Sequence, residues 1–375
     1  MATQAKLFFD LATPGVRGLR PYEPGKPLDE LERELGIRNA VKLASNENPL
    51  GPSPKAMAAV REVVPELYRY PDGNGFALKS ALSIRHKVPM GSLTLGNGSN
   101  DVLEMIARAF LTPDHEAVFS EHAFAVYPIV TQAVGATPRV APAQDGSDGA
   151  VFGHDLEAMK SLVGKRTRVI FVANPNNPTG TWLRSTDLDE FISAMPGHVL
   201  VVVDEAYFEY VEEPEYPNTI PWVARYPNLI VTRTFSKAYG LAGLRIGYSV
   251  SHPDVADLLN RVRQPFNVNS MAEVAALAAL DDESHLQRSR QMNRDGMKQL
   301  TEAFSELGLE YIPSVGNFVC VDLARDASQV NESLLRCGVI LRPVANYGLP
   351  NHLRITVGSK QDNQRVIAAL RKALL

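Results

Sequence analysis

The residues best suited to chemistry stand together in the segment 234–247, which reads TFSKAYGLAGLRIG. Lys237 directly follows Ser236 at the end of an apolar run, and Arg245 comes eight residues later, after a glycine-rich stretch. A lysine amine forms an imine with an aldehyde once it is deprotonated, which burial and nearby positive charge assist. The Ser236 hydroxyl and the forked Arg245 cation both suit a phosphate group. Because a lysine in a surface loop produces the same local pattern, this segment needs support from elsewhere in the chain.

A second candidate follows the apolar run 199–203, VLVVV, where the acid Asp204 precedes Tyr207 by three residues. An acid after a buried strand lies at the carboxyl edge of a sheet, where α/β folds bind ligands. Asp204 there can keep a pyridine nitrogen protonated, and Tyr207 can direct its phenol at the ring oxygen. A strand ending in Asp-Glu is also typical of nucleotidases, which need a phosphate-binding loop that ends in Gly-Lys-Ser/Thr. The nearest match, 73–80, has Leu78 in place of that glycine, so the nucleotidase alternative fails.

Two more motifs offer groups for an anion and for a ring. The segment 95–101, LGNGSND, opens a helical pattern, where backbone N–H groups and the helix dipole favour an anion. An ordinary helix cap explains it equally well, and a dinucleotide fingerprint would need glycine at Asp101. In the segment 172–180, VANPNNPTG, two prolines force a turn after a strand, and Asn177 can present its amide to a ligand. A plain turn would explain the prolines but not the three asparagines.

The elements that must position these residues alternate between helices and buried strands. Apolar runs without polar alternation indicate strands covered on both faces, so the sequence predicts an α/β, doubly wound, mostly parallel sheet sandwiched by helices. After Asp254 a long helical region, short strands and a closing helix predict a smaller α+β unit. We expect an N-terminal arm over residues 1–53 that packs on the small domain and a partner subunit, a large domain over 54–265 and a small C-terminal domain over 266–375. The expected strands are 117–120, 168–173, 199–204, 229–232, 317–323, 339–341 and 353–357, and the expected helices are 28–35, 54–62, 75–86, 100–110, 254–307 with two interruptions, and 360–374.

Composition excludes several classes of protein. A chain of 375 residues exceeds the usual size of a single hydrophobic core, so two domains are expected. With 38 basic and 42 acidic residues, the chain has a slight negative net charge, which argues against a nucleic-acid-binding surface. No apolar stretch reaches the roughly 18 residues of a membrane span, and no signal-peptide pattern opens the chain. Two cysteines fit a reducing cytoplasm, and eight histidines without a ligand motif predict no metal. The sequence therefore predicts a soluble, cytoplasmic protein without a nucleic-acid, membrane or metal partner.

The four motifs, in this order, resemble those of the fold-type-I pyridoxal-phosphate-dependent aminotransferases, and the resemblance covers nearly the full length. Within that superfamily the chain is most similar to the histidinol-phosphate aminotransferases. The segments that support the closer match are 19–25 (LRPYEPG), 42–51 (KLASNENPLG), 68–72 (YRYPD) and 353–358 (LRITVG).

The resemblance implies a role in cofactor binding for each motif. Lys237 is implied to be the Schiff-base lysine and the proton carrier, and Asp204 to pair with the pyridinium nitrogen. Asn177 and Tyr207 are implied to contact the ring oxygen. The remaining implied cofactor contacts are the Ser99 and Asn100 amides, Ser236 and Arg245 at the phosphate, Tyr70 from the neighbouring subunit of a homodimer, and Phe124 stacked on the ring, where many relatives have tyrosine.

The resemblance also implies the substrates. Arg354 stands where family members bind a substrate anion, and Arg342, Tyr22 and Asn177 are further candidates. One guanidinium fork can accept the carboxylate of glutamate or 2-oxoglutarate and the phosphate of histidinol phosphate. The implied reaction is a ping-pong transamination of L-histidinol phosphate with 2-oxoglutarate, which yields imidazole-acetol phosphate and glutamate in histidine biosynthesis.

Two alternatives stay open beside this reaction, and a third, from another class of protein, is disfavoured. An aromatic (phenylalanine) aminotransferase of the same subfamily would accept a side chain of similar shape. A threonine-phosphate decarboxylase shares the fold but would release CO₂ and need no keto acid. A non-catalytic regulator would need an added DNA-binding segment, for which the arm before Pro54 is short and not basic enough.

Overall fold

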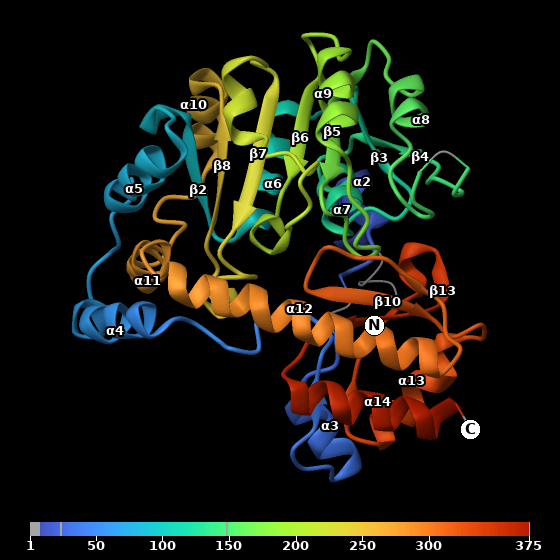
Figure 1. The fold of residues 1–375 in the computed structure, drawn as a ribbon. Coiled ribbons are helices and arrows are strands. Elements are labelled where there is room, and N and C mark those ends of the chain that lie inside the picture. The colour runs from blue at the N-terminus through green and yellow to red at the C-terminus, as the bar shows by residue number, and fades with distance from the viewer. Residues whose placement is uncertain (1–7, 23–24, 148, 375) are drawn as a thin grey trace.

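A seven-stranded sheet forms the centre of the larger of two units in the computed structural model, which describes residues 8–22, 25–147 and 149–374 (Figure 1). Its strand order is β2-β8-β7-β6-β5-β3-β4. β8 runs antiparallel to both of its neighbours, and the other pairs are parallel. The strands are β2 (Leu93–Gly96), β3 (Glu116–Ser120), β4 (Thr137–Ala141), β5 (Thr167–Ala173), β6 (Leu200–Asp204), β7 (Leu229–Thr234) and β8 (Gly247–Ser251).

Helices cover both faces of this sheet, which explains its uninterrupted apolar strands. In β5, Val169 and Phe171 belong to one core cluster, while Ile170 and Val172 belong to another on the opposite face. Because successive side chains of a strand point to opposite faces, both faces must be apolar when both are buried. The predicted sandwich is confirmed. The helices of this unit are α4 (Pro54–Val63), α5 (Phe76–His86), α6 (Ser99–Phe110), α7 (Val126–Ala133), α8 (Leu156–Ser161), α9 (Ser185–Ser193), α10 (Pro253–Val262) and α11 (Ser270–Leu280).

The smaller unit is built around an antiparallel sheet of order β12-β13-β10-β9. A two-stranded parallel pair joins β1 of the N-terminal arm to β11. The strands and helices of the smaller unit are β1 (Val41–Lys42), β9 (Tyr311–Ile312), β10 (Phe318–Asp322), β11 (Val339–Ile340), β12 (Arg342–Val344), β13 (Leu349–Thr356), α13 (Ala327–Arg336) and α14 (Lys360–Leu374).

The long helix α12 (Glu283–Glu306) connects the two units (Figure 1). Leu286, near its start, belongs to the core of the larger unit, whereas Leu300 and Phe304, near its end, belong to the core of the smaller one. α11 packs on α4 and α5, and its alanines belong to the core of the larger unit. We therefore propose that the chain divides into its two domains within α12, later than the residue 265 expected from the sequence.

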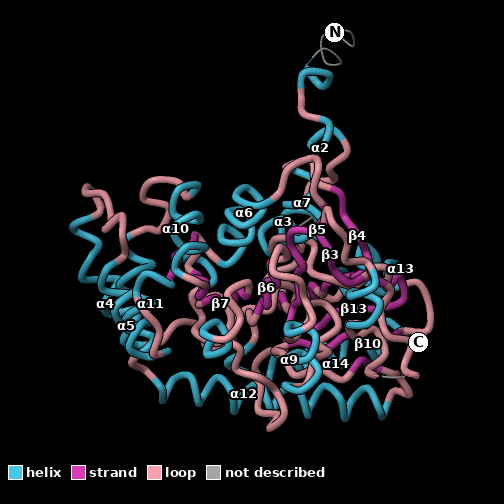
Figure 2. The backbone as a smooth tube through the Cα atoms, turned by 90° about the horizontal axis from the view of Figure 1, so that it is seen from above, coloured by secondary structure: helices cyan, strands magenta, loops and turns pink. Residues whose placement is uncertain are grey.

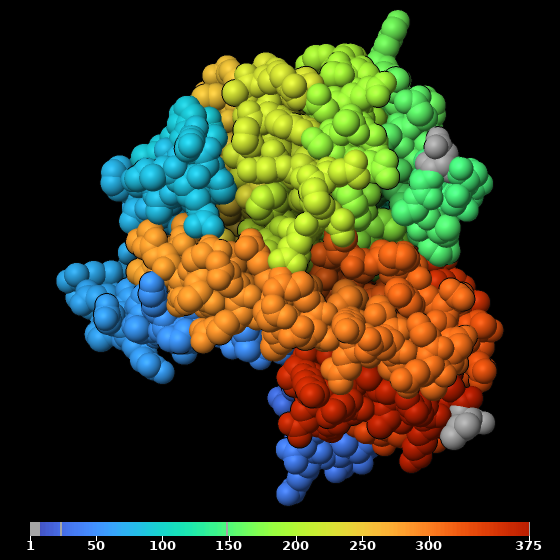
Figure 3. Space-filling view, in the orientation of Figure 1, coloured from blue at the N-terminus to red at the C-terminus, as the bar shows by residue number. Residues whose placement is uncertain are grey.

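The N-terminal arm packs on the smaller unit. Helix α3 (Leu28–Leu35) buries Leu31 against Ala44 and Ile340. Further upstream, α2 (Pro14–Arg17) lies beside α7, and residues 8–13 before it project from the body of the molecule (Figure 2). Residues 1–7, and residues 23 and 24 of the segment 19–25, lie outside the described residues. The space-filling view shows the C-terminal unit, orange to red, below the larger unit (Figure 3).

The sequence missed the less apolar strands. β4 is an edge strand that carries Pro138 and Arg139 and is largely exposed, so its pattern does not differ from that of a loop. The predicted helices 28–35 and 360–374 have the bounds of α3 and α14, and the two interruptions of 254–307 separate α10, α11 and α12. None of the helices in the described part of the chain is both long and apolar enough to cross a membrane.

Candidate active site

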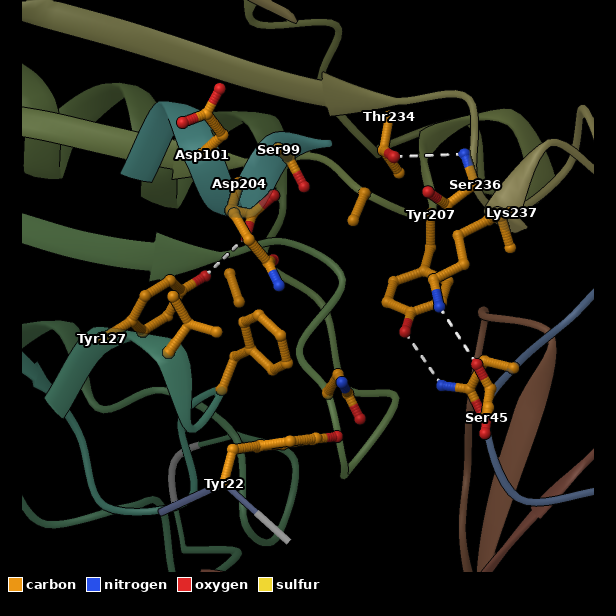
Figure 4. A pocket seen from close by; sticks show the side chains of 18 of the residues that line it. Tyr22, Ser45, Ser99, Asp101, Tyr127, Asp204, Tyr207, Thr234, Ser236 and Lys237 are labelled. Atoms are coloured by element: carbon orange, nitrogen blue, oxygen red, sulfur yellow. Dashed lines mark hydrogen bonds between the residues drawn. The ribbon is translucent and has the colours of Figure 1, made fainter. Parts of the chain in front are cut away.

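The carboxyl ends of β5, β6 and β7 open into a cavity of about 670 Å³ (Figure 4). Parallel neighbouring strands bring residues that are far apart in sequence to one edge of the sheet. All predicted site residues except Tyr70 and Arg342 line this cavity. They are Tyr22, Ser99, Asn100, Phe124, Asn177, Asp204, Tyr207, Ser236, Lys237, Arg245 and Arg354.

Lys237 extends from the loop after β7 into the cavity. Its Nζ donates to the backbone oxygen of Ser45 at 3.2 Å (Figure 4). Burial and the positive charges of Arg354 and Arg245 together lower the pKa of Lys237 to about 7, against the opposing effects of Glu47 and Asp204. An amine with such a pKa is largely neutral just above pH 7, which is the nucleophilic form.

Asp204 ends β6 and is buried at the back of the cavity. Its Oδ2 accepts from the Tyr127 hydroxyl at 2.9 Å (Figure 4). Its Oδ1 accepts from the Thr232 hydroxyl at 2.9 Å. Burial raises the pKa of Asp204, while these two hydrogen bonds lower it. The Tyr127 ring is itself held, stacked on Phe171 at 4.8 Å and edge-on to Phe124 at 5.9 Å. The acid therefore has one fixed donor on each oxygen.

Sequence reasoning missed Tyr127 and Thr232 as partners of this acid. Tyr127 stands three residues after Phe124, one helical turn on, which is the only sequence signal that links it to the site. Thr232 lies on β7 beside Asp204 on β6, a pairing that strand order determines.

The start of α6 and the Arg245 side chain form an anion-binding cup. Arg245 Nη1 donates to the Ser236 hydroxyl at 3.4 Å and to the Ala242 oxygen at 3.1 Å. A Cβ at Gly98, whose φ is +83°, would lie 2.4 Å from Arg245 Nη2, and a Cβ at Gly247 would lie 2.4 Å from the Ser99 nitrogen. The two glycines thus keep backbone N–H groups, a hydroxyl and a guanidinium close together, a donor set that fits a phosphate.

Arg354, on β13 of the smaller unit, forms another wall of the cavity. Its Nη1 donates to Asn177 Oδ1 at 2.5 Å, and its Nη2 donates to the Ala44 oxygen at 2.6 Å. Its buried Nε has no hydrogen-bond partner in the described part of the chain. A buried guanidinium N–H without a partner is costly, so this side chain suits a ligand anion.

Tyr207 contacts the N-terminal arm. Its hydroxyl oxygen accepts from Asn46 Nδ2 at 2.8 Å. Burial raises the pKa of Tyr207 to about 12, so the phenol keeps its proton at neutral pH. Sequence reasoning gave Asn46 no role, although it stands within the segment 42–51.

Two predicted residues lie outside the cavity. The Arg342 guanidinium is 5.6 Å from the ring centroid of Tyr22, and Arg342 faces Arg354 across the β12–β13 pair. Tyr70 is 82% exposed and stacks on Phe266 at 4.7 Å, so one chain alone does not bring it to the cavity.

Of the three asparagines in the segment 172–180, only Asn177 lines the cavity. Asn174 Oδ1 accepts from the Leu183 nitrogen at 2.9 Å. Asn176 Nδ2 donates to Thr179 at 2.9 Å. Two of the asparagines therefore stabilise the turn that presents the third.

Chemistry on an amino group through an aldehyde cofactor requires a near-neutral amine, a buried acid and a phosphate cup in one cavity, and this structure provides all three. Across the residues that the structure describes, no three His, Cys, Asp or Glu side chains form a group that could hold a metal ion. A family model described as aminotransferase class I and II matches residues 38–370, so the chain belongs to this family of enzymes.

Relatives that match over nearly the full length identify a smaller group within this family. The chain is 60% identical over 98% of both chains to histidinol-phosphate aminotransferase 1 of Nitrosococcus oceani, and 62% identical over 98% of both to histidinol-phosphate aminotransferase 2 of Pseudomonas fluorescens Pf0-1. Within the class I and II aminotransferases, the chain therefore belongs to the histidinol-phosphate aminotransferases.

Solved structures agree with this assignment. The crystal structure of histidinol-phosphate aminotransferase from Sinorhizobium meliloti in complex with pyridoxal-5'-phosphate has a TM-score of 0.89 and 29% identity, and each chain is covered to 97%. A Thermus thermophilus aspartate aminotransferase, 22% identical with a TM-score of 0.82 and coverage of 96% and 97%, shares the fold. The predicted fold-type-I class is confirmed.

Proposed function

We propose that this enzyme transfers the amino group of L-histidinol phosphate to 2-oxoglutarate, giving imidazole-acetol phosphate and glutamate in histidine biosynthesis, with pyridoxal phosphate as cofactor. The observation that carries the proposal is the buried Lys237, whose pKa is lowered to about 7, in a cavity that holds both a buried acid and a phosphate cup. The names of the full-length relatives, and the cofactor in the Sinorhizobium meliloti structure, support the same reaction.

Several sides of the cavity would hold the cofactor, which when bound supplies an aldehyde that accepts the amino group and a ring that withdraws electrons from the substrate carbon. Asp204 would pair with the ring nitrogen, and its two fixed donors stabilise the carboxylate form. Asn177 and Tyr207 would contact the ring oxygen. The Ser99 and Asn100 amides, Ser236 and Arg245 would hold the phosphate, and Phe124 would cover the ring face; all of them line the cavity.

Lys237 moves the proton between the substrate carbon and the cofactor carbon. Its lowered pKa leaves a neutral amine ready to accept a proton near pH 7. Arg354 binds the anion of either substrate, because its buried Nε and planar fork suit carboxylate and phosphate alike. Tyr22 lines the substrate end of the cavity, and Arg342 acts from behind it, with its guanidinium 5.6 Å from the centroid of the Tyr22 ring.

The active form is a cytoplasmic homodimer in which Tyr70 reaches the cofactor phosphate of the neighbouring subunit. Tyr70 is 82% exposed and stacks on Phe266, which is 46% exposed, and Tyr68 and Phe76, close to Tyr70 in the sequence, are 74% and 64% exposed. A surface so rich in exposed aromatic rings is typical of a subunit interface.

The proposal is tested with purified enzyme, 2-oxoglutarate as acceptor, and histidinol phosphate or phenylalanine as donor. We expect a higher kcat/KM for histidinol phosphate than for phenylalanine. One glutamate should form for each imidazole-acetol phosphate, and no CO₂ should be released. A higher kcat/KM for phenylalanine would establish the aromatic aminotransferase instead. Release of CO₂ from threonine phosphate, in an assay without a keto acid, would establish the decarboxylase. Borohydride reduction of the holoenzyme should attach a pyridoxyl group to Lys237, and Lys237→Ala should lose both this label and the visible absorbance.

A further inference from the structure

The segment Ala44–Asn48, which we call the strap, brings the N-terminal arm into contact with three functional side chains. The Ala44 oxygen accepts from Arg354 at 2.6 Å, and the Ser45 oxygen accepts from Lys237 at 3.2 Å. Asn46 Nδ2 donates to the Tyr207 hydroxyl oxygen at 2.8 Å. The first two contacts use backbone oxygens, which any residue supplies. The third depends on the side chain of Asn46.

Asn46 is held in one orientation by the smaller unit. Its backbone N–H donates to Thr356 Oγ1 at 2.9 Å, and the Thr356 hydroxyl in turn donates to Asn46 Oδ1 at 3.1 Å. Asn317 Nδ2 donates to the backbone carbonyl oxygen of Asn46 at 3.0 Å. Since Oδ1 is used by Thr356, Nδ2 faces Tyr207. The buried side chain and a backbone φ of +56° leave this residue little freedom.

The Asn46 contact determines where the phenol proton of Tyr207 can go. An oxygen that accepts from an amide N–H has its own proton free for another acceptor. Lys237 Nζ lies 5.5 Å from the centroid of the Tyr207 ring, and Figure 4 shows its amine beside that ring. The hydroxyl proton of Tyr207 therefore remains available to an acceptor in the cavity, which Tyr207 and Lys237 both line.

We propose that Asn46 is a positioning residue, which directs the Tyr207 hydroxyl proton at the cofactor ring oxygen and is held in place by Thr356 and Asn317 of the smaller unit. This inference rests on the proposed function. A donor to the ring oxygen draws negative charge away from the neighbouring Lys237 Nζ, so that the linked Nζ binds its proton less tightly. The smaller unit thereby influences the proton affinity of Lys237 through the strap.

The test uses holoenzyme and follows the visible absorbance against pH, which reports the proton on the linked Lys237 Nζ. Asn46→Asp keeps the side-chain shape, a backbone conformation that Asp tolerates, and an acceptor for Thr356, but it replaces the donor by a second acceptor. The Tyr207 hydroxyl then donates to Asp instead. We expect the apparent pKa to rise by about one to two pH units, the usual effect of losing a hydrogen bond to a charged group.

The added negative charge of Asn46→Asp raises the same pKa, and a double-mutant cycle with Tyr207→Phe separates the two effects. If Asn46 acts through the phenol, Tyr207→Phe alone gives a similar rise, and Asn46→Asp shifts the pKa less in the Tyr207→Phe background than in wild type. Fully additive shifts would show an effect of charge only and would overturn the proposal.

The uncharged variant Asn46→Gly accepts the same backbone φ and gives an independent measurement if the Asp variant folds poorly. It should raise the pKa in the same direction by a smaller amount, because the phenol proton is then undirected. An unchanged titration in Asn46→Gly also overturns the proposal. Failure of the proposed function is a separate outcome, since wild-type enzyme would then show neither visible absorbance nor amino transfer.

Discussion

Burial of the Lys237 amine should destabilise the protein in the absence of cofactor, and Lys237→Met should relieve this cost. Methionine has a similar length, needs no hydration and fills irregular space in apolar surroundings. In the folded protein the pKa of Lys237 is lowered from 10.5 to about 7, mainly by burial and then by Arg354. The unfolded chain therefore binds more protons than the folded one between these two pH values, and stability rises with pH across this window.

The magnitude follows from the same pKa. A lowering from 10.5 to about 7 corresponds to roughly 4–5 kcal/mol against the folded state, at 1.36 kcal/mol for each tenfold change in the protonation constant. The methionine variant loses the hydrogen bond to Ser45, which contributes about 1 kcal/mol. Near pH 7 the variant without cofactor should therefore be more stable than wild type by about 3 kcal/mol. The difference should vanish near pH 10, and above it wild type should be the more stable by about 1 kcal/mol, because the hydrogen bond to Ser45 is still missing from the variant.

Urea unfolding of both proteins without cofactor, at equal protein concentration and at several pH values from 6.5 to 10, measures this difference. The exposed Lys165 provides a matched control, since Lys165→Met replaces a lysine already in water and should change stability little at any pH. A stability difference between wild type and Lys237→Met that stays constant over the whole range would refute the argument that a buried, neutralised amine is the cause.

Three more predictions concern other parts of the molecule. Gly98→Ala should weaken cofactor binding about tenfold or more, because the new Cβ would displace the Arg245 side chain. Gly91→Ala is the matched control, since open space surrounds Gly91. Equilibrium binding of pyridoxal phosphate gives the dissociation constant of each variant. Arg354→Lys should raise KM for glutamate and for histidinol phosphate alike by about tenfold to a hundredfold, since one fork serves both, and an effect on one substrate alone would contradict this. Burial raises the pKa of Glu209 to about 7, so the folded protein binds this proton more tightly than the unfolded chain does. As the pH rises from 4.5 to 7, wild type should therefore lose up to about 3 kcal/mol of stability through this group. Urea titrations at pH 5, 6 and 8 should show a smaller fall in the free energy of unfolding for Glu209→Gln.

The parts of the fold that could be predicted from the sequence are those with a local cause. The run 199–203 is apolar at every position because the two faces of β6 meet two different core clusters. Helix α14 has a periodic apolar stripe and keeps its predicted bounds. The edge strand β4 has no such local cause. It is held by pairing with β3, which its exposed and proline-containing sequence does not report.

The candidate site divides in the same way. Lys237, Asp204 and Arg245 stand in segments whose residue types already indicate a chemistry, and the structure brings them to one cavity. The partners that orient these groups come from distant parts of the chain. Tyr127 donates a hydrogen bond to Asp204, 77 residues away in the sequence, and Asn46 donates one to Tyr207, 161 residues away. Nothing in the local pattern of a tyrosine or an asparagine specifies such a partner, so only the folded arrangement identifies them.

These long-range partners explain why the site needs both structural units. After burial, the largest cause that lowers the pKa of Lys237 is the charge of Arg354, which stands on β13 of the smaller unit. The same guanidinium holds the Asn177 side chain of the larger unit and the Ala44 oxygen of the strap. A displacement of the smaller unit would therefore change the proton affinity of the lysine and the anion-binding fork together. The large unit alone contains the amine and the acid, but the state of the amine depends on a charge that the other unit supplies.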